Sequence, residues 1–286
     1  MINIKLLKGD ALTLLKDVGS KSVDLIFADP PYNLSGENYL TCKSGKIAVC
    51  DKGSWDQIEN IHEFNSKWVE ECIRVLKDGG TIWISGTLHN HPSIGVILKK
   101  LKLWIINDII WFKPNAPPLM QKNRFVPSTE LIWIASKSKK YYFNYEIAKR
   151  ISNGKQMRNL WIISAERHIT SHPTEKPEKL LERIVLIGSK EGDTILDPFM
   201  GSGTTGVVAK RLKRNFIGIE IADTYFEMAK KRIDSTHLEL NLGNFLENIK
   251  DSKSVQLNLD SKKNKKNVYI EPNSCIPRSE PHPPAP

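Results

Sequence analysis

The sequence predicts an α/β protein with a doubly wound, mainly parallel sheet. Apolar runs suited to buried strands alternate with segments of helical spacing along most of the chain. Two of the predicted strands, at 23–28 and 193–197, end directly in motifs rich in Asp, Pro and Gly. Because ligands of open α/β sheets bind at the carboxyl ends of the strands, these two motifs mark the candidate site.

The predicted elements follow one another at short intervals. Strands are expected at 2–7, 23–28, 81–85, 103–112, 130–135, 193–197 and 216–220. Helices are expected at 11–18, 62–76 and 94–101, and in the amphipathic segment that follows Pro177, a residue suited to a first helical turn. Lys77–Gly80 is expected to close the second helix, because glycines commonly end helices.

The domain organisation is predicted from changes in composition. Residues 1–112 are expected to form a first half with a lid at 33–57, and residues 172–237 a second half. Between them, residues 113–171 are expected to form an insert. The segment 238–286 is rich in Lys, Asn, Ser and Pro and is expected to be a disordered tail.

Composition narrows the functional classes. The 286 residues are 40% hydrophobic and 26% charged, which suits one α/β domain with an insert. No apolar run reaches the length of a membrane span, and the N-terminus lacks a signal sequence, so a cytoplasmic protein with no membrane partner is expected. The four cysteines lack Cys-x-x-Cys spacing, so we expect free thiols and no metal site.

The charge distribution predicts a nucleic-acid partner. The formal net charge is +10, and from 113 to 170 eleven Lys and Arg face three Glu. Aromatic residues, Trp161 among them, are interleaved with these basic residues, as in surfaces that bind phosphates and stack bases. A solvated basic face is the alternative. The candidate nucleic-acid contacts are Lys113, Arg124 as a reader of guanine, and Lys139 and Lys140 as phosphate contacts.

The motif Asp29-Pro30-Pro31-Tyr32 suits a planar group with an exocyclic amine. The two prolines fix their φ angles and lack N–H donors, so their carbonyl groups point in set directions beside a carboxylate. An aromatic ring follows directly. Acceptors next to a flat apolar face are suited to adenine or cytosine lifted out of the base stack. A simple strand-to-turn junction is the alternative interpretation.

The second motif predicts a nucleoside cofactor. Glycines at 201, 203 and 206 follow a strand and precede a helix, the context that G-x-G-x-x-G requires. Glu220 ends the next strand roughly twenty residues on, where a carboxylate can bind ribose hydroxyls. NAD would explain this motif alone. S-adenosylmethionine explains both motifs, since its methyl group needs a nearby nucleophilic nitrogen.

Three motifs carry a family resemblance. In this order, 29–32, 172–177 and 197–204 resemble the β class of DNA amino-methyltransferases, in which the catalytic motif precedes the cofactor motif, a circularly permuted order. Segments 51–56, 83–86 and 154–157 look most like its DpnII type, with the HinfI and cell-cycle-regulated types close behind. The resemblance covers about residues 1–235. It implies the S-adenosylmethionine-dependent methyltransferase fold, with the insert as the target-recognition region.

The resemblance implies roles at the first motif. Asp29 and the carbonyl group of Pro30 would accept the two amino hydrogens of a flipped adenine, next to Pro31, and Tyr32 would stack on the ring. Asp at the first position favours adenine N6 over cytosine N4, the alternative target, which in this class more often goes with Ser.

The resemblance also implies the residues that bind S-adenosylmethionine. Glu220 would hold the ribose, Asp10 would lie near the adenine, and Thr174 and Lys176 near the methionine end. Glu175 stands where the family commonly has Gln. The remaining expected cofactor residues are Ala11, Asp197, Pro198, Phe199, Gly201, Ser202, Gly203 and Thr204.

The resemblance suggests GATC as the target, with GANTC second, in double-stranded DNA, with single-stranded DNA as the other substrate. It leaves open a cognate restriction endonuclease acting on the same site and a homodimer. A nucleic-acid-binding protein without catalysis and an NAD-dependent enzyme are the other classes. The first should show decay at Asp29 or Gly201, and neither position is decayed.

Overall fold

The computed structural model describes residues 2–32, 40–41, 47–48, 58–118, 123–166, 175–239, 243 and 246. Backbone contacts divide the chain into Met1–Asp251 and Ser252–Pro286. The second unit lies wholly outside the described residues, as does nearly all of the predicted tail. The predicted lid also falls almost entirely outside them, apart from the two-residue strands β3 (Leu40–Thr41) and β4 (Ile47–Ala48), which pair with each other.

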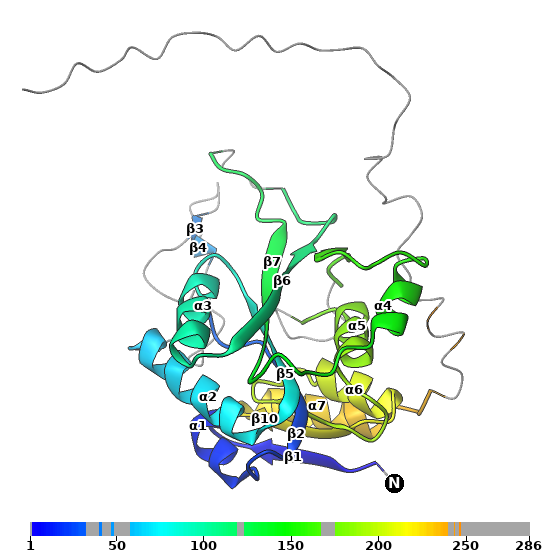
Figure 1. Cartoon of the computed structure of the whole chain (residues 1–286). Coiled ribbons are helices and arrows are strands. Elements are labelled where there is room, and N and C mark those ends of the chain that lie inside the picture. Colours follow the sequence, from blue (N-terminus) through cyan, green and yellow to red (C-terminus); the bar gives the residue numbers. More distant parts are fainter. Residues whose placement is uncertain are drawn as a thin grey trace, which may run out of the picture. The chain divides into compact units, whose positions relative to one another are not determined.

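An eight-stranded sheet forms the centre of the fold (Figure 1). Its strand order is β1-β10-β9-β2-β5-β7-β6-β8. Only β7 runs antiparallel to its neighbours among these eight strands. The predicted doubly wound, mainly parallel sheet is therefore confirmed. The strands are β1 (Ile4–Lys8), β2 (Val23–Ala28), β5 (Leu76–Gly86), β6 (Trp104–Phe112), β7 (Thr129–Ser136), β8 (Leu160–Ile162), β9 (Thr194–Asp197) and β10 (Asn215–Glu220).

Helices cover both faces of the sheet. Figure 1 shows α1 (Ala11–Leu14), α2 (Ile61–Val75) and α3 (His91–Lys100) on one side. A short 3-10 helix, Leu15–Asp17, extends α1. The other side carries α4 (Tyr145–Ile151), α5 (Glu178–Gly188), α6 (Thr204–Arg211) and α7 (Asp223–Asp234). Each face has its own core of buried apolar side chains.

Strand β2 shows why both faces are covered. Leu25 and Phe27 are buried in the core under α4–α7, whereas Ile26 and Ala28 are buried in the core under α1–α3. Successive side chains of a strand point to opposite faces, so a continuous apolar run needs a packed layer on each side. This burial holds the end of β2, and with it the first motif, in a fixed position.

The predicted insert is not separate from the sheet. Strand β7 lies between β5 and β6, and α4 packs against α5. Trp111 and Trp161 are buried, and the ring of Trp133 stacks on His91 with centroids 4.5 Å apart. The prediction that Trp161 belongs to a base-stacking surface is wrong, because this ring helps to fill the core. Within 113–171, the β6–β7 connection and the segment after β8 both leave the sheet at the edge where the motifs lie, because β6 and β8 run parallel to β5.

Lys77–Gly80 do not close a helix as predicted, because β5 begins at Leu76. Leu76 pairs with Val23, and Thr81 pairs with Leu25, so residues 77–80 form an irregularity in the strand. A Cβ atom on Gly80 would lie 2.6 Å from the carbonyl oxygen of Asp24. The glycine therefore permits a close approach of β5 to β2.

Among the described residues, no helix is both long enough and apolar enough to cross a membrane.

Candidate active site

The two predicted motifs meet because their strands are neighbours. Strands β2 and β9 pair in parallel, with Leu25 opposite Ile195, so both end at the same edge of the sheet. A cavity of about 300 Å³ lies at this edge. Residues from both motifs line it, together with residues from the β1–α1 turn, the ends of β2 and β10, α2 and the segment before it, α7, and the segment before α5. Among the lining residues are Gly9, Asp10, Ala11, Phe27, Asp29, Pro30, Pro31, Tyr32, Ile58, Phe64, Glu175, Lys176, Asp197, Pro198, Phe199, Met200, Gly201, Ser202, Thr204, Glu220, Ile221 and Tyr225.

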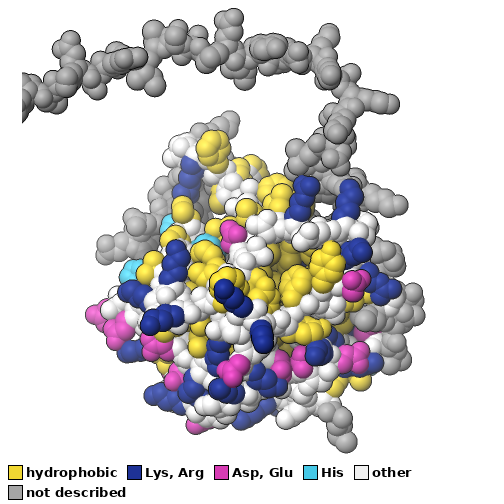
Figure 2. Space-filling view, viewed as in Figure 1, with side chains coloured by type: hydrophobic (Ala, Val, Ile, Leu, Met, Phe, Trp, Pro, Cys, Tyr) yellow, Lys and Arg dark blue, Asp and Glu magenta, His cyan; other side chains and the backbone are white. Residues whose placement is uncertain are grey.

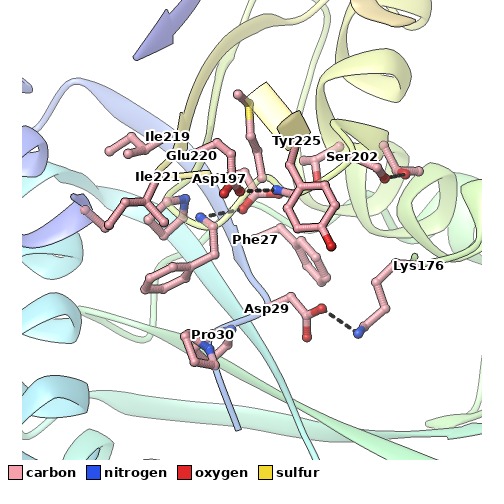
Figure 3. Close-up of a pocket in the computed structure, with 18 of the residues that line it drawn as sticks. Phe27, Asp29, Pro30, Lys176, Asp197, Ser202, Ile219, Glu220, Ile221 and Tyr225 are labelled. Carbon is pink, nitrogen blue, oxygen red and sulfur yellow. Dashed lines mark hydrogen bonds and ion pairs between the residues drawn. The ribbon is translucent and has the colours of Figure 1, made fainter. Parts of the chain in front are cut away.

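The carboxylate of Asp29 is held from two sides. The hydroxyl group of Tyr32 donates a hydrogen bond to Oδ1, and Nζ of Lys176 lies 2.5 Å from Oδ2. Figure 3 shows Asp29 and Lys176 pointing toward each other across the cavity. The Tyr32 side chain is buried, and its hydroxyl group also lies 3.1 Å from Oγ of Ser85. Burial, together with the charge of Asp29, raises the pKa of Tyr32 well above its usual value.

Asp197, at the end of β9, organises the glycine-rich turn. Its Oδ2 accepts a hydrogen bond of 2.5 Å from the hydroxyl group of Thr205, and its Oδ1 accepts one of 3.0 Å from the backbone N–H of Phe199. The side chain is buried, and burial raises the pKa of Asp197 from 3.8 to about 7. These bonds fix the turn against the first turn of α6.

Glu220 fixes the other side of the same turn. Its Oε2 accepts a 2.9 Å hydrogen bond from the backbone N–H of Gly201, and its Oε1 accepts a 2.8 Å bond from that of Ala222. Burial raises the pKa of Glu220. A carboxylate has about four acceptor positions, so Glu220 can also accept a hydrogen bond from a ligand in the cavity.

An aromatic wall lies beside the turn. The ring of Phe199 meets Trp68 edge to face, with centroids 5.3 Å apart, and it lies 6.0 Å from the ring of Phe64 on the same helix. Trp68 is fully buried, whereas Phe64 and Phe199 line the cavity. The wall offers an apolar surface to a flat ring close to the acceptors of Asp10 and Glu220.

Ten of the twelve expected cofactor residues line this cavity, and among the described residues Gly203 is not one of the lining residues. Gly203 has φ of +81° at the start of α6, and a Cβ atom there would lie 2.7 Å from Cβ of Ala229 in α7. The glycine permits the close packing of α6 against α7, and its contact with the cofactor stays a prediction. Thr174 lies outside the described residues. Lys176 does line the cavity, where its ammonium group lies beside the carboxylates of Asp29 and Glu130 and over the ring of Tyr32.

Several cavity residues were missed from the sequence. Ile221 directly follows β10 and Tyr225 lies in the first turn of α7, so the position of the predicted ribose acid could have indicated them (Figure 3). Phe64 lies in the helix predicted at 62–76, where an apolar residue at helical spacing indicates a core position rather than a cavity. The side chain of Glu175 is 3% exposed, and its Oε1 lies 2.6 Å from Nη1 of Arg232 in α7. No local sequence signal connects those two positions.

The structure separates the four candidate nucleic-acid residues. Arg124 lies in the β6–β7 connection, which leaves the sheet at the same edge as the cavity, and is exposed. The ammonium group of Lys113 is committed to Glu130 at 3.0 Å, and its side chain is only 18% exposed. Lys139 and Lys140 follow the carboxyl end of β7, where Ser136 pairs with Thr81. Because β7 runs antiparallel to β5, this end lies at the edge of the sheet opposite the cavity.

The positions of Lys139 and Lys140 argue against their predicted role as phosphate contacts. A phosphate bound at the cavity edge would lie at the other end of β7 from Lys139 and Lys140. Nζ of Lys139 lies 4.9 Å from the ring centroid of Trp104. The sequence could not show this, because it does not reveal that β7 runs antiparallel. Figure 2 shows Lys and Arg side chains spread widely over this face of the molecule rather than gathered at one place.

The comparisons with known proteins decide the family. Residues 23–231 match the family model described as "DNA methylase". The chain belongs to this family. The methylase is 46% identical over 240 residues to "Type II methyltransferase M2.DpnII" from Streptococcus pneumoniae, a match that covers 80% of this chain and 89% of that protein. It is also 46% identical over 242 residues to "Type II methyltransferase M2.LlaDCHI" from Lactococcus lactis subsp. cremoris, covering 81% and 90%.

A solved structure shares the fold of this methylase. The crystal structure of the M1.HpyAVI–SAM complex superimposes with a TM-score of 0.61 at 28% identity, covering 80% of this chain and 99% of that one. The family resemblance carried by the three motifs is therefore confirmed.

Proposed function

We propose that this methylase transfers a methyl group from S-adenosylmethionine to N6 of an adenine flipped out of DNA at a specific site. The observation that carries the proposal is the shared cavity, in which Asp29 and Pro30 face the turn organised by Asp197 and Glu220. The two Type II methyltransferases at 46% identity support a modification enzyme of a restriction-modification system.

The cavity fits S-adenosylmethionine in its chemistry. Glu220 offers acceptors for the ribose hydroxyls, and the wall of Phe199 and Phe64 offers a face for the adenine, next to Asp10. A SAM complex of the related M1.HpyAVI supports this assignment. When bound, this cofactor supplies an electrophilic methyl group.

Asp29 and Pro30 would act on the target base. The lone pair of an adenine amino group is delocalised into the ring, which makes the nitrogen a poor nucleophile. Two acceptors fixed before the reaction, the Asp29 carboxylate and the Pro30 carbonyl group, favour a pyramidal nitrogen whose lone pair is available. In this structure Tyr32 donates to Asp29, and its stacking on the base stays a prediction.

Target and partners extend the proposal. We expect GATC as the recognised sequence, with GANTC second. Double-stranded DNA is the expected substrate, and single-stranded DNA is the other. A restriction endonuclease with the same target and a homodimer are the protein partners to test.

The proposal is tested by separating transfer from cofactor binding. Asp29→Ala should lower methyl transfer to DNA by at least about 100-fold while leaving the S-adenosylmethionine dissociation constant nearly unchanged. Glu220→Ala should instead weaken cofactor binding by about tenfold or more, with DNA affinity retained. Initial rates and calorimetric titrations on the same preparations measure both. Retained turnover in Asp29→Ala would remove this carboxylate from the proposed role.

A further inference from the structure

A charged donor sits beside the proposed catalytic acceptor. Nζ of Lys176 lies 2.5 Å from Oδ2 of Asp29, and the lysine side chain is 7% exposed. Lys176 comes from the segment before α5, whereas Asp29 comes from the end of β2, so the two reach the cavity from different parts of the chain (Figure 3). Together they present an acceptor and a donor, side by side, to the same space.

A second carboxylate lies behind the lysine. Oε2 of Glu130, in β7, lies 3.4 Å from Nζ of Lys176, and Oε1 lies 3.0 Å from Nζ of Lys113. Within the described part of the chain, Oε2 of Glu130 is buried and accepts no hydrogen bond. If the ammonium group of Lys176 turns from Asp29 toward a ligand, the carboxylate of Glu130 still lies beside it.

The two acids also keep the lysine charged. Burial alone would lower the pKa of Lys176, but the carboxylates of Asp29 and Glu130 raise it well above its usual value. In the same way, burial alone would raise the pKa of Glu130, whereas Lys176 and Lys113 hold it below its usual value. The donor next to Asp29 is a full ammonium group at neutral pH.

This pair of groups matches one edge of adenine. The Watson–Crick edge of adenine carries the N6 amino donor next to the N1 acceptor, and enzymes commonly read a flipped base on this edge. A carboxylate oxygen next to an ammonium group is complementary to that order. Guanine presents the reverse order, a carbonyl acceptor next to an N–H donor, and would place like groups together at both positions.

We propose that Lys176 donates a hydrogen bond to ring nitrogen N1 of the target adenine while Asp29 accepts from N6, and that Glu130 is the positioning residue that holds Lys176. This inference rests on the proposed function and goes beyond it, since it gives the lysine a role on the base rather than at the methionine end of the cofactor. Cytosine shows the same order of donor and acceptor, so Lys176 selects an amino-bearing base rather than adenine alone.

The test removes N1 from the target. Duplexes carry adenine, 1-deazaadenine or 7-deazaadenine at the methylated position, and the wild-type protein, Lys176→Met and Lys176→Arg are assayed on each. The wild type should lose about 10- to 100-fold in kcat/KM on 1-deazaadenine, the range expected for a hydrogen bond to a charged group. The 7-deazaadenine duplex keeps N1 and should be methylated at close to the rate of adenine.

The decisive quantity is the N1 penalty, the factor by which kcat/KM falls when 1-deazaadenine replaces adenine, measured for each variant. Removing N1 also changes the electron density on the amine, so the wild-type penalty alone does not identify the partner. Lys176→Met should be slow on adenine but show little further loss on 1-deazaadenine, whereas Lys176→Arg, which keeps a charged donor, should retain most of the penalty. Glu130→Gln should reduce the penalty in part, because the lysine is less firmly held.

The outcomes separate three interpretations. Cofactor titration should give Lys176→Met a dissociation constant within about threefold of wild type, which also shows that the variant is folded. A large loss of cofactor affinity, with the N1 penalty unchanged, would place Lys176 on the cofactor and overturn the inference. Equal wild-type rates on adenine and 1-deazaadenine would overturn it while leaving the proposed function intact. A wild-type protein that methylates none of the duplexes would overturn both.

Discussion

Asp197 is a single residue whose burial should be measurable in the stability of the whole protein. A carboxyl group with a raised pKa in the folded state contributes stability at low pH. This contribution is lost as the pH rises from 3.8, where the unfolded chain releases the proton, to about 7, where the folded chain releases it. Between these values the unfolding free energy should fall by about 1.4 kcal/mol per pH unit from this group alone.

Asp197→Asn should therefore flatten the dependence of stability on pH. Chemical denaturation of the cofactor-free protein at intervals from about pH 5 to pH 7 measures it. Asp17→Asn, a change at an exposed carboxylate, is the matched control and should leave the slope as in wild type. An unchanged slope in Asp197→Asn would mean that the carboxyl group is already ionised in the folded protein.

Some residues of the site could be predicted from the sequence, whereas the pairings between their side chains could not. Asp29, Asp197 and Glu220 could be predicted because each ends a strand, and strand ends of one parallel sheet converge. The pairing of Asp29 with Lys176 and of Glu175 with Arg232 could not be predicted, because each joins distant segments through side-chain geometry. The Arg232 pair gives a physical reason for the acidic residue where the family commonly has Gln.

At the scale of elements, the direction of β7 decides which loops can contact DNA at the site. Because β7 runs antiparallel to β5, the β6–β7 connection opens at the cavity edge and the segment after β7 opens at the opposite edge. The sequence predicted the strand but not its direction, so it grouped Arg124 with Lys139 and Lys140. The alternation of strands and helices, by contrast, was enough to predict the layers.

The two edges should respond differently to loss of charge. Arg124→Ala should relax the choice of target sequence, since an arginine that reads a guanine edge contributes about 1–3 kcal/mol of discrimination. The matched control, Lys139→Ala with Lys140→Ala, should leave both the target sequence and the salt dependence of binding close to wild type. The measurement is methylation of duplexes with each single-base variant of the site, at several salt concentrations.

Either of two results would count against this placement. A uniform loss on all substrates in Arg124→Ala would make it a phosphate contact. A flatter salt dependence in the double lysine variant would mean that DNA reaches the far edge of the sheet.

At the scale of the whole molecule, the order of motifs along the chain matters less than the order of strands in the sheet. The first motif lies far ahead of the glycine-rich turn in the sequence, and the pairing of β2 with β9 brings the two together.

The net charge of +10 is also a property of the whole molecule. It favours a polyanionic partner, but its wide spread over one face means that it does not by itself locate the DNA (Figure 2).

Sequencing of modified bases in plasmid DNA from cells that express the protein is the most direct test of site-specific adenine methylation. We expect N6-methyladenine at one short recognition sequence, GATC before GANTC, and none above background with Asp29→Ala. N4-methylcytosine at a specific site would contradict the assignment of adenine. Plasmid DNA without any site-specific methylation, from cells in which the folded protein is present, would contradict the proposed function itself.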